Sequence, residues 1–400
     1  MLIPEQSTQK RKRNRKKIVT EGIGVSSDTF VLTEQGWKQF KDVQETDILL
    51  VLDPIKMELD YAPISRLAKS MYDGDILHYE TSRIDARMTL NVPLIALNRR
   101  AGDGVGLLKS LRTSGTVNKR TLVPYKSFSY VGGSDTEKIA FSIPEFSYVK
   151  EETGETIVME KFSVSYNSWL EFMGFWVSGI RVNGHLPTDG SILFLHTNEE
   201  KQYVAELFKR MGILDVFHSS RISVREKDGS TIVYSRQIYD YLYKQFYSNG
   251  KKRIPRWILN LKKGYLQWFM KGLLYGCGHV EELMNEMTRI TFTSVSEDYL
   301  YDISELVLKV YGTIPRILPI TNFPYGKDKI EYSYYRVNVT VNHNNKYITY
   351  GVPKQEPYVG EICHVFFDSD RYLYYLARRE KKSFWIGGSL KKSLEPDDFS

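Results

Sequence analysis

The sequence predicts a multidomain protein, in which an all-β domain formed by the N- and C-terminal segments carries an inserted, duplicated α+β domain. Three observations predict this fold class. The chain has 400 residues, enough for two or three domains with cores of their own. Residues 21–100 and 343–389 read as short strands separated by turns. Between them, two similar apolar helices recur 98 residues apart, which indicates an internal duplication.

Composition is that of a soluble globular protein, with 42% hydrophobic and 26% charged residues. Two cysteines, Cys277 and Cys363, exclude a disulfide framework and a four-cysteine zinc site. The N-terminus lacks the apolar core of a signal peptide, and no apolar run approaches the roughly 20 residues that cross a bilayer. We therefore expect an intracellular protein of a reducing compartment, without membrane insertion, for which the nucleus and a virus particle are candidate locations.

A basic arm, residues 1–20, opens the chain. Seven of its cations fall in eight positions: Lys10, Arg11, Lys12, Arg13, Arg15, Lys16 and Lys17. The net charge of the whole chain is +7, so the remainder is near neutral. A block of like charges does not fold alone, which predicts a disordered arm. It would bind double-stranded DNA or another polyanion, or serve as a nuclear import address, the alternative being a solvated tail without a partner.

The first β segment shows strand patterns at 30–33, 37–40 and 48–52, with a turn at 34–36. Asp28-Thr29, Leu32-Thr33 and Gly36-Trp37-Lys38, followed by Asp42-Val43, resemble the opening block of an intein, or Hint, domain. This resemblance implies an all-β splicing fold, in which a homing endonuclease is often inserted. The segment Tyr358 to Cys363 and the strands up to Ser389 resemble its closing blocks.

The positions that carry splicing chemistry in that family differ here. The resemblance puts Gly24 where an intein has its nucleophilic Cys or Ser, and glycine has no side chain to attack a carbonyl. The histidine of the family's Thr-x-x-His block is Val92, which transfers no proton. The terminal asparagine is replaced by Gly388, ahead of Ser389. The resemblance therefore implies a splicing fold without splicing activity.

Residues 101–167 carry no motif and are expected to be a linker or insertion with some structure, and residues 390–400 a polar tail. A spliced product would hold only residues 1–23 and 389–400, too few for a core. We therefore expect the chain itself to be the mature product.

The two similar helices lie at Trp169 to Gly179 and from about Tyr265 to Gly278. Gly174 aligns with Gly272, and glycines at Gly272, Gly276 and Gly278 would let another backbone approach closely. Apolar and small residues cover almost every side of the last two turns of the second helix, which predicts burial all round. Both helices resemble the paired helices of LAGLIDADG homing endonucleases, and the lead-in at Ile254-Pro255 strengthens the likeness.

In that family the last Asp of each paired helix binds Mg²⁺ and cuts DNA. The matching positions here are Gly179 and Cys277, so the resemblance implies no cofactor, with Mg²⁺ needed only if cleavage survives. Neither Asp189 nor Glu281 and Glu282 has the family's register. Cys277 and His279 form a lone Cys-x-His pair, a weak metal signal.

Residues 168–342 show an αββαββα order, which fits a duplicated LAGLIDADG-like domain with two sheets over a DNA duplex. Six arginines lie on or beside its predicted strands: Arg221, Arg225, Arg236, Arg289, Arg316 and Arg336. They would contact phosphates on such a saddle, or else form a solvated face balanced by nearby acids.

Two functions compete on these grounds. The first is a pseudoenzyme, inactive in splicing and cleavage, that is retained as a nucleic-acid-binding or scaffold protein. The second is a structural or assembly component, such as a minor virion protein, whose 28 tyrosines serve surfaces that dock protein partners. A residual homing endonuclease is the third reading, and it needs carboxylates that the motif lacks.

Overall fold

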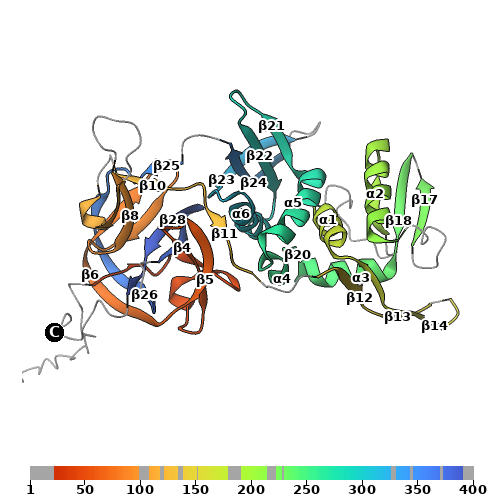
Figure 1. Ribbon diagram of the computed structural model, residues 1–400, viewed down its shortest axis with the longest axis horizontal. Coiled ribbons are helices and arrows are strands. Elements are labelled where there is room, and N and C mark those ends of the chain that lie inside the picture. Colours follow the sequence, from red (N-terminus) through yellow and green to blue (C-terminus); the bar gives the residue numbers. More distant parts are fainter. Residues whose placement is uncertain are drawn as a thin grey trace, which may run out of the picture.

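The computed structural model describes residues 22–98, 108–117, 121–133, 138–150, 152–178, 191–213, 222–227, 229–325, 330–342, 346–369 and 373–390. The basic arm and Gly179 lie outside these residues, as do Asp189, Arg221 and the tail. A mostly β part and a part with six helices lie side by side along the long axis (Figure 1). No helix in the described ranges is both long and apolar enough to cross a membrane.

The β part interleaves strands from both ends of the chain. One sheet has the order β1 (Val25–Ser26), β7 (Asp85–Met88), β6 (Arg66–Glu80), β26 (Lys354–Phe367) and β29 (Ser389–Leu390). A second has the order β11 (Ser129–Tyr130), β5 (Glu58–Pro63), β4 (Ile48–Asp53), β2 (Phe30–Thr33), β27 (Tyr374–Arg379) and β28 (Lys382–Gly387), with β3 (Gly36–Gln39) on β2. The strands expected at 30–33 and 48–52 are thereby confirmed.

A third sheet draws part of the segment 101–167 into the β part. Its order is β25 (Tyr347–Thr349), β10 (Leu122–Pro124), β8 (Pro93–Asn98) and β9 (Leu108–Thr113). Later in the segment, β12 (Ala140–Ile143) pairs with β15 (Phe162–Ser165), and β13 (Phe146–Val149) with β14 (Thr156–Met159). These ribbons extend beside the helices, so the segment serves both parts of the molecule (Figure 1). Two short 3-10 turns, Phe40–Asp42 and Ser114–Thr116, complete the β part.

The α+β part contains two similar halves. The first has α1 (Tyr166–Val177), β16 (Ser191–Leu195), α2 (Asn198–Met211), β17 (Ser223–Lys227), β18 (Ser230–Tyr234) and α3 (Arg236–Phe246). After β19 (Tyr247–Ser248), β20 (Lys251–Lys252) and α4 (Arg256–Leu259), the second has α5 (Lys263–Cys277), β21 (His279–Glu282), β22 (Thr288–Ser294), α6 (Glu297–Tyr311), β23 (Arg316–Tyr325) and β24 (Ile330–Val341).

The sheets of the two halves match strand by strand. The order β16-β18-β17 in one corresponds to β22-β24-β23 in the other, with β21 added at the edge of the second sheet. Helix caps follow the sequence: Thr197 and Glu200 form a capping box before α2, and α6 ends at Gly312 with φ of 61°. The duplication expected from the repeated helix is therefore present in the fold.

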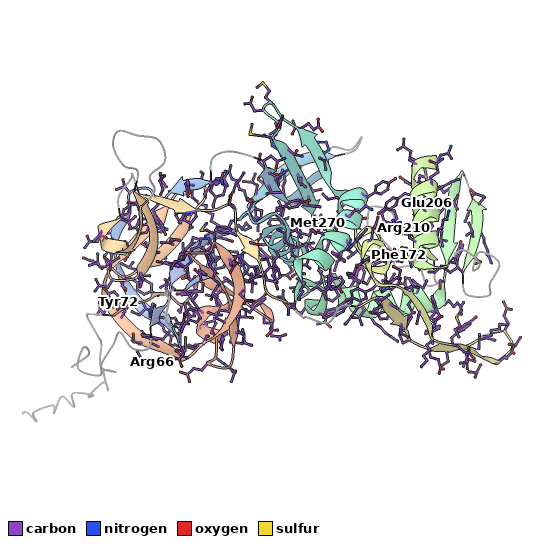
Figure 2. All side chains as sticks on the ribbon, in the orientation of Figure 1. Arg66, Tyr72, Phe172, Glu206, Arg210 and Met270 are labelled. Atoms are coloured by element: carbon purple, nitrogen blue, oxygen red, sulfur yellow. The ribbon has the colours of Figure 1, made fainter. Side chains whose placement is uncertain are left out.

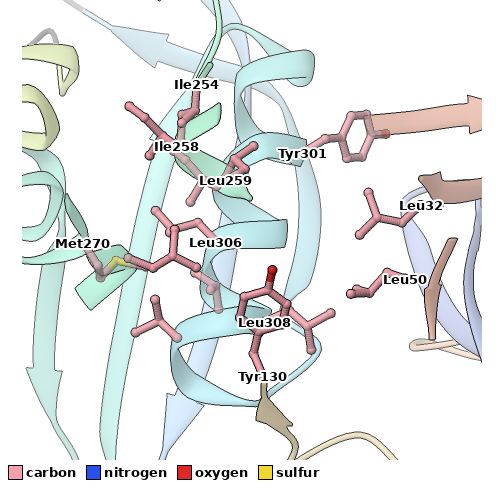
Figure 3. Packing of buried hydrophobic residues seen from close by; sticks show 14 of the residues in the cluster. Leu32, Leu50, Tyr130, Ile254, Ile258, Leu259, Met270, Tyr301, Leu306 and Leu308 are labelled. Carbon is pink, nitrogen blue, oxygen red and sulfur yellow. The ribbon is translucent and has the colours of Figure 1, made fainter. Parts of the chain in front are cut away.

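Burial of the helices differs from one expectation. In α5, Gln267, Lys271 and Tyr275 form an exposed stripe, so the prediction that its last turns are buried all round was wrong. The helix buried on every side is α6, whose residues from Tyr299 to Val310 are all buried. It packs on Met270 of α5 on one side and faces Leu32 and Leu50 of the β part on the other (Figure 3).

A buried charge network joins α6 to both parts. The carboxylate of Glu305 accepts two hydrogen bonds from Arg256, at 2.7 and 2.9 Å, and one from Lys309 at 2.6 Å. The Tyr61 hydroxyl of the β part donates to Glu305 at 3.2 Å and accepts from Lys309 at 2.9 Å. Arg256 also donates to the carbonyl of Glu34 at 3.0 Å. The side chains of Glu305 and Lys309 are fully buried, so each depends on its hydrogen-bond partners to offset the free-energy cost of losing water.

Glu305→Gln should lower the free energy of unfolding by about 3–5 kcal/mol at neutral pH, because it leaves buried cations without a counter-charge. Urea denaturation measures this change. Glu58→Gln is the matched control, since Glu58 belongs to an exposed ion pair with Lys56 at 3.7 Å and its loss should cost about 1 kcal/mol or less. Equal effects of the two substitutions would contradict the importance of the network.

The cost of Glu305→Gln should also depend on pH. Burial alone would raise the pKa of Glu305, but Arg256 and Lys309 override it and lower the pKa from 4.5 to about 2. A depressed carboxyl pKa stabilises the folded state fully above the unfolded value and is lost as the pH falls through the folded value. The difference between wild type and variant should therefore shrink between pH 4.5 and 2. A difference constant over that range would show that Glu305 is not ionised in the fold.

Candidate functional site

Helices α1 and α5 touch backbone to backbone through two glycines. A Cβ placed on Gly174 would lie 2.0 Å from the carbonyl oxygen of Phe269, and one placed on Gly272 would lie 1.8 Å from that of Glu171. The two contacts are equivalent, because Glu171 and Phe269 are also 98 residues apart. The helices are thus related by a local two-fold axis through the contact. The close approach expected of Gly272 is confirmed.

Cys277, a free and partly buried cysteine, lies at the end of this helix pair. Burial raises the pKa of the Cys277 thiol to about 12, although the ammonium of Lys252 acts in the opposite direction. This shift favours the protonated thiol over the thiolate. The nearby Tyr299 hydroxyl donates to the carbonyl of Val177 at 3.1 Å. Within the described ranges, no three His, Cys, Asp or Glu side chains gather as a metal site.

The acids considered near this end do not converge. Glu281 lies on β21 and pairs with Arg289 at 3.0 Å, while Glu282 is exposed on the same strand. Asp189 and Gly179 fall outside the described residues. His279 is exposed at the start of β21.

A buried acid that the sequence reasoning missed is Glu171, in the middle of α1. It accepts hydrogen bonds from Arg210 at 2.6 Å and from Tyr203 at 2.9 Å, both on α2, and pairs with Lys271 of α5 at 3.0 Å. Burial raises the pKa of Glu171, but these three partners lower it below its ordinary value. Figure 2 labels Arg210 on α2 and Phe172, the residue that follows Glu171 on α1. The signal in the sequence was a single Glu inside an otherwise apolar helix. In the structure this residue connects α1 to α2 and α5.

The three residues singled out by the intein resemblance, Gly24, Val92 and Gly388, all lie in the β part. Gly24 donates its N–H to Thr89 Oγ1 at 3.1 Å and accepts from the N–H of Thr89 at 3.0 Å. A Cβ on Gly24 would lie 2.8 Å from the carbonyl oxygen of Cys363 on β26, and one on Gly388 would lie 2.5 Å from Phe367 on the same strand. Gly24 is thus packed against the backbone of β26, and Gly388 against the ring of Phe367.

Val92 is fully buried, and its carbonyl accepts from the N–H of Ser114 at 2.9 Å. Burial also shifts the pKa values of two titratable side chains on β26, Cys363 and His364. Burial raises the pKa of Cys363 to about 12. Burial, followed by the charge of Arg66, lowers the pKa of His364 to about 3, so its imidazole is neutral.

Three of the predicted arginines share one face of the sheet β21-β22-β24-β23. Residues paired across antiparallel strands point to the same side, and Arg289 pairs with Thr340 while Arg316 pairs with Asn338. Arg336 lies two and four positions before these partners, so it points the same way. The opposite face is buried and consists of Ile290, Phe292, Val337 and Val339. The three arginines therefore lie on the outer face.

The remaining basic residues are distributed differently. Arg225 lies on β17 with its guanidinium 5.2 Å from the ring of Tyr234. Arg236 begins α3 and lies 4.4 Å from the ring of Tyr148 on the β13–β14 ribbon, so it is beside the first sheet and not on its face. Arg221 and the arm from Lys10 to Lys17 lie outside the described residues.

Known proteins similar to this chain fall into three kinds. No family model matches it. A curated ATP-dependent Clp protease proteolytic subunit from Chlamydomonas moewusii is 25% identical over 313 residues, which are 73% of this chain and 29% of that protein. The chain thus spans about three-tenths of that protein's length.

Among solved structures, the chain is similar to the homing endonuclease I-DmoI in complex with DNA and Mn, at 14% identity and a TM-score of 0.28, over 43% of this chain and 89% of that one. It is also similar to a splice-inactive variant of the AceL NrdHF class 3 split intein, at 13% identity and a TM-score of 0.21, over 53% of this chain and 97% of that one. Both scores are low, so the description of the fold rests on the chain's own contacts.

Gly174→Ala and Gly272→Ala should each lower the free energy of unfolding by about 3 kcal/mol or more, because the added methyl group must separate two packed backbones. Thermal or urea denaturation measures this. Gly264→Ala is the control within the same helix, since a Cβ at Gly264 meets nothing within 4 Å. It should be neutral or stabilise by up to about 1 kcal/mol. Comparable losses at Gly264 and Gly272 would contradict the backbone contact.

Proposed function

We propose that this chain is a pseudoenzyme of intein and homing-endonuclease type that neither splices nor cuts, and that it binds duplex nucleic acid through its α+β part. One observation carries the proposal. Both candidate centres have a closely packed backbone, at the paired glycines in one and at the Gly24–Thr89 contact in the other, but the residues there lack the reacting groups.

Splicing fails on this reading for steric and chemical reasons together. Gly24 offers no oxygen or sulfur nucleophile, and a side chain there would collide with the Cys363 carbonyl. Val92 cannot protonate a leaving amine, and Gly388 has no side-chain amide that could cyclise.

DNA cleavage fails for lack of ligands. Mg²⁺ prefers carboxylate and water oxygens, whereas position 277 offers a protonated thiol beside the ammonium of Lys252. The partner position, Gly179, has no side chain.

Binding would survive these losses, because it uses other residues. Arg289, Arg316 and Arg336 on one sheet face are spaced by strand geometry, and guanidinium groups bind phosphates in a bidentate manner. Arg289 forms an ion pair with Glu281, and a phosphate would have to displace this carboxylate. The basic arm would add affinity without sequence preference. The competing function, a scaffold that docks proteins in an assembly, makes no use of this face.

Binding of a 30-base-pair duplex should be measured across a salt series, with Mg²⁺ present and the DNA run on a gel afterwards. Replacing both Arg289 and Arg336 by Gln should weaken binding and reduce the slope of log K against log salt by about 2, since each phosphate contact contributes about 0.9. Lys209→Gln, at an exposed position on α2, is the control for loss of a cation away from this face, and it should change the slope by less than the double variant does. The wild type should leave the DNA uncut.

A chain lacking residues 1–20 separates the two functions. Retention of salt-dependent binding supports the sheet face. Complete loss of binding with the arm would favour the protein-docking scaffold. DNA cut in the presence of Mg²⁺, and protected by a chelator, would refute the pseudoenzyme.

A further inference from the structure

A pocket of about 380 Å³ lies where the β part meets the α+β part. One wall is the start of β23, with Arg316. The opposite walls come from the turn at Ser82-Arg83, from Tyr125, and from the turn Glu380 to Lys382 between β27 and β28. Its volume is within the range of small-molecule sites, which occur preferentially between domains.

The lining of this pocket is strongly basic. Four cations, Arg83, Arg316, Lys381 and Lys382, face a single carboxylate, Glu380. Lys381 pairs at 3.5 Å with Glu297, while the structure shows no ion pair for the other three cations among the residues it describes. Clustered like charges repel one another, so this arrangement is costly without an anion.

The neighbouring Lys126 reports the same positive field. Its pKa is lowered from 10.5 to about 8, first by burial and then by the guanidinium of Arg83. Arg83 also lies 4.9 Å from the ring of Tyr125, so the guanidinium is held in place at the mouth of the pocket.

The turn that supplies the lysines is built from unfavourable residues. Glu380 and Lys381 both have positive φ, 49° and 74°. Two-residue hairpin turns of this kind favour Asn-Gly or Asp-Gly, because other side chains are strained there. The chain instead keeps charged side chains at the turn, which projects them into the pocket. Strain of this kind is typical of binding sites.

We infer that this junction pocket binds the phosphate of a nucleotide, either free or within a nucleic acid strand, with cations contributed by both parts of the molecule. The apolar residues of the lining, Ile314, Ile317, Leu318 and Ile348, would accommodate the base or sugar. Arginine side chains bind phosphate oxygens in a bidentate manner, and the lysines add point charge. This site shares Arg316 with the sheet face that carries the proposed function, but its other cations, Arg83, Lys381 and Lys382, lie outside that face.

The test uses the full chain with Arg83 and Lys382 both replaced by Gln. Two probes are titrated separately: ATP by calorimetry, and the 30-base-pair duplex by fluorescence anisotropy. We expect binding of at least one probe to weaken roughly tenfold or more, because two charge-assisted hydrogen bonds are lost. Lys209→Gln, outside the pocket, should bind as wild type does. The basic arm is present in every variant, so its contribution is the same throughout.

Lys381→Gly distinguishes a binding role from a structural one. Glycine is the favoured residue at positive φ, so the melting temperature should stay at or close to that of wild type while ligand affinity falls. A purely structural lysine would show the reverse pattern.

The two probes identify the source of the phosphate. Weakened ATP binding with unchanged duplex binding assigns the pocket to a free nucleotide, and weakened duplex binding assigns it to a strand. Unchanged binding of both probes in the Arg83 and Lys382 variant would overturn the inference. Because Arg289 and Arg336 remain intact there, that result would leave the proposed duplex binding by the sheet face untouched.

Discussion

The arrangement of the α+β part depends on the contact between the backbones of α1 and α5. Neither Gly174 nor Gly272 leaves room for a methyl group, so the distance between the helices is set by main-chain atoms. Each helix leads its own sheet, and the two sheets therefore take positions related by the axis through the contact. Glu171 reinforces the arrangement, because its buried carboxylate is neutralised only when α2 and α5 are both in place.

The residues around Gly24 and around Cys277 are closely packed. Around Gly24 and Gly388 the strand β26 approaches so closely that a side chain would be excluded. At the end of α5, the thiol of Cys277 lies against Lys252, and Tyr299 binds the last carbonyl of α1. Restoring a nucleophile or a ligand would thus require local repacking as well as one substitution.

The sequence predicted local elements well and their surroundings less well. The strands at 30–33 and 48–52 and the two repeated helices are determined by short-range patterns, and these were predicted. The burial of Glu305 and Lys309 was not, because their partners Tyr61 and Arg256 come from distant segments. For the same reason, the exposed stripe on α5 and the position of Arg236 beside Tyr148 could not be foreseen. The pocket between the parts brings Arg83 together with Arg316 and Lys381, which follow it by more than 200 residues in the sequence. No local motif spans such a separation.

The burial of α6 on all sides has a consequence for how the molecule unfolds. This helix supplies core residues to its own sheet and, through Tyr301 and Lys309, to the β part, where Tyr301 stacks 3.6 Å from the guanidinium of Arg378. Melting the α+β part would expose buried charges and aromatic rings of the β part at the same time. The two parts are therefore thermodynamically coupled, so that heat or denaturant should remove them in a single transition, as in one domain. Removing the α+β part would therefore also destabilise the β part, because the β part uses contacts from Tyr301 and Lys309.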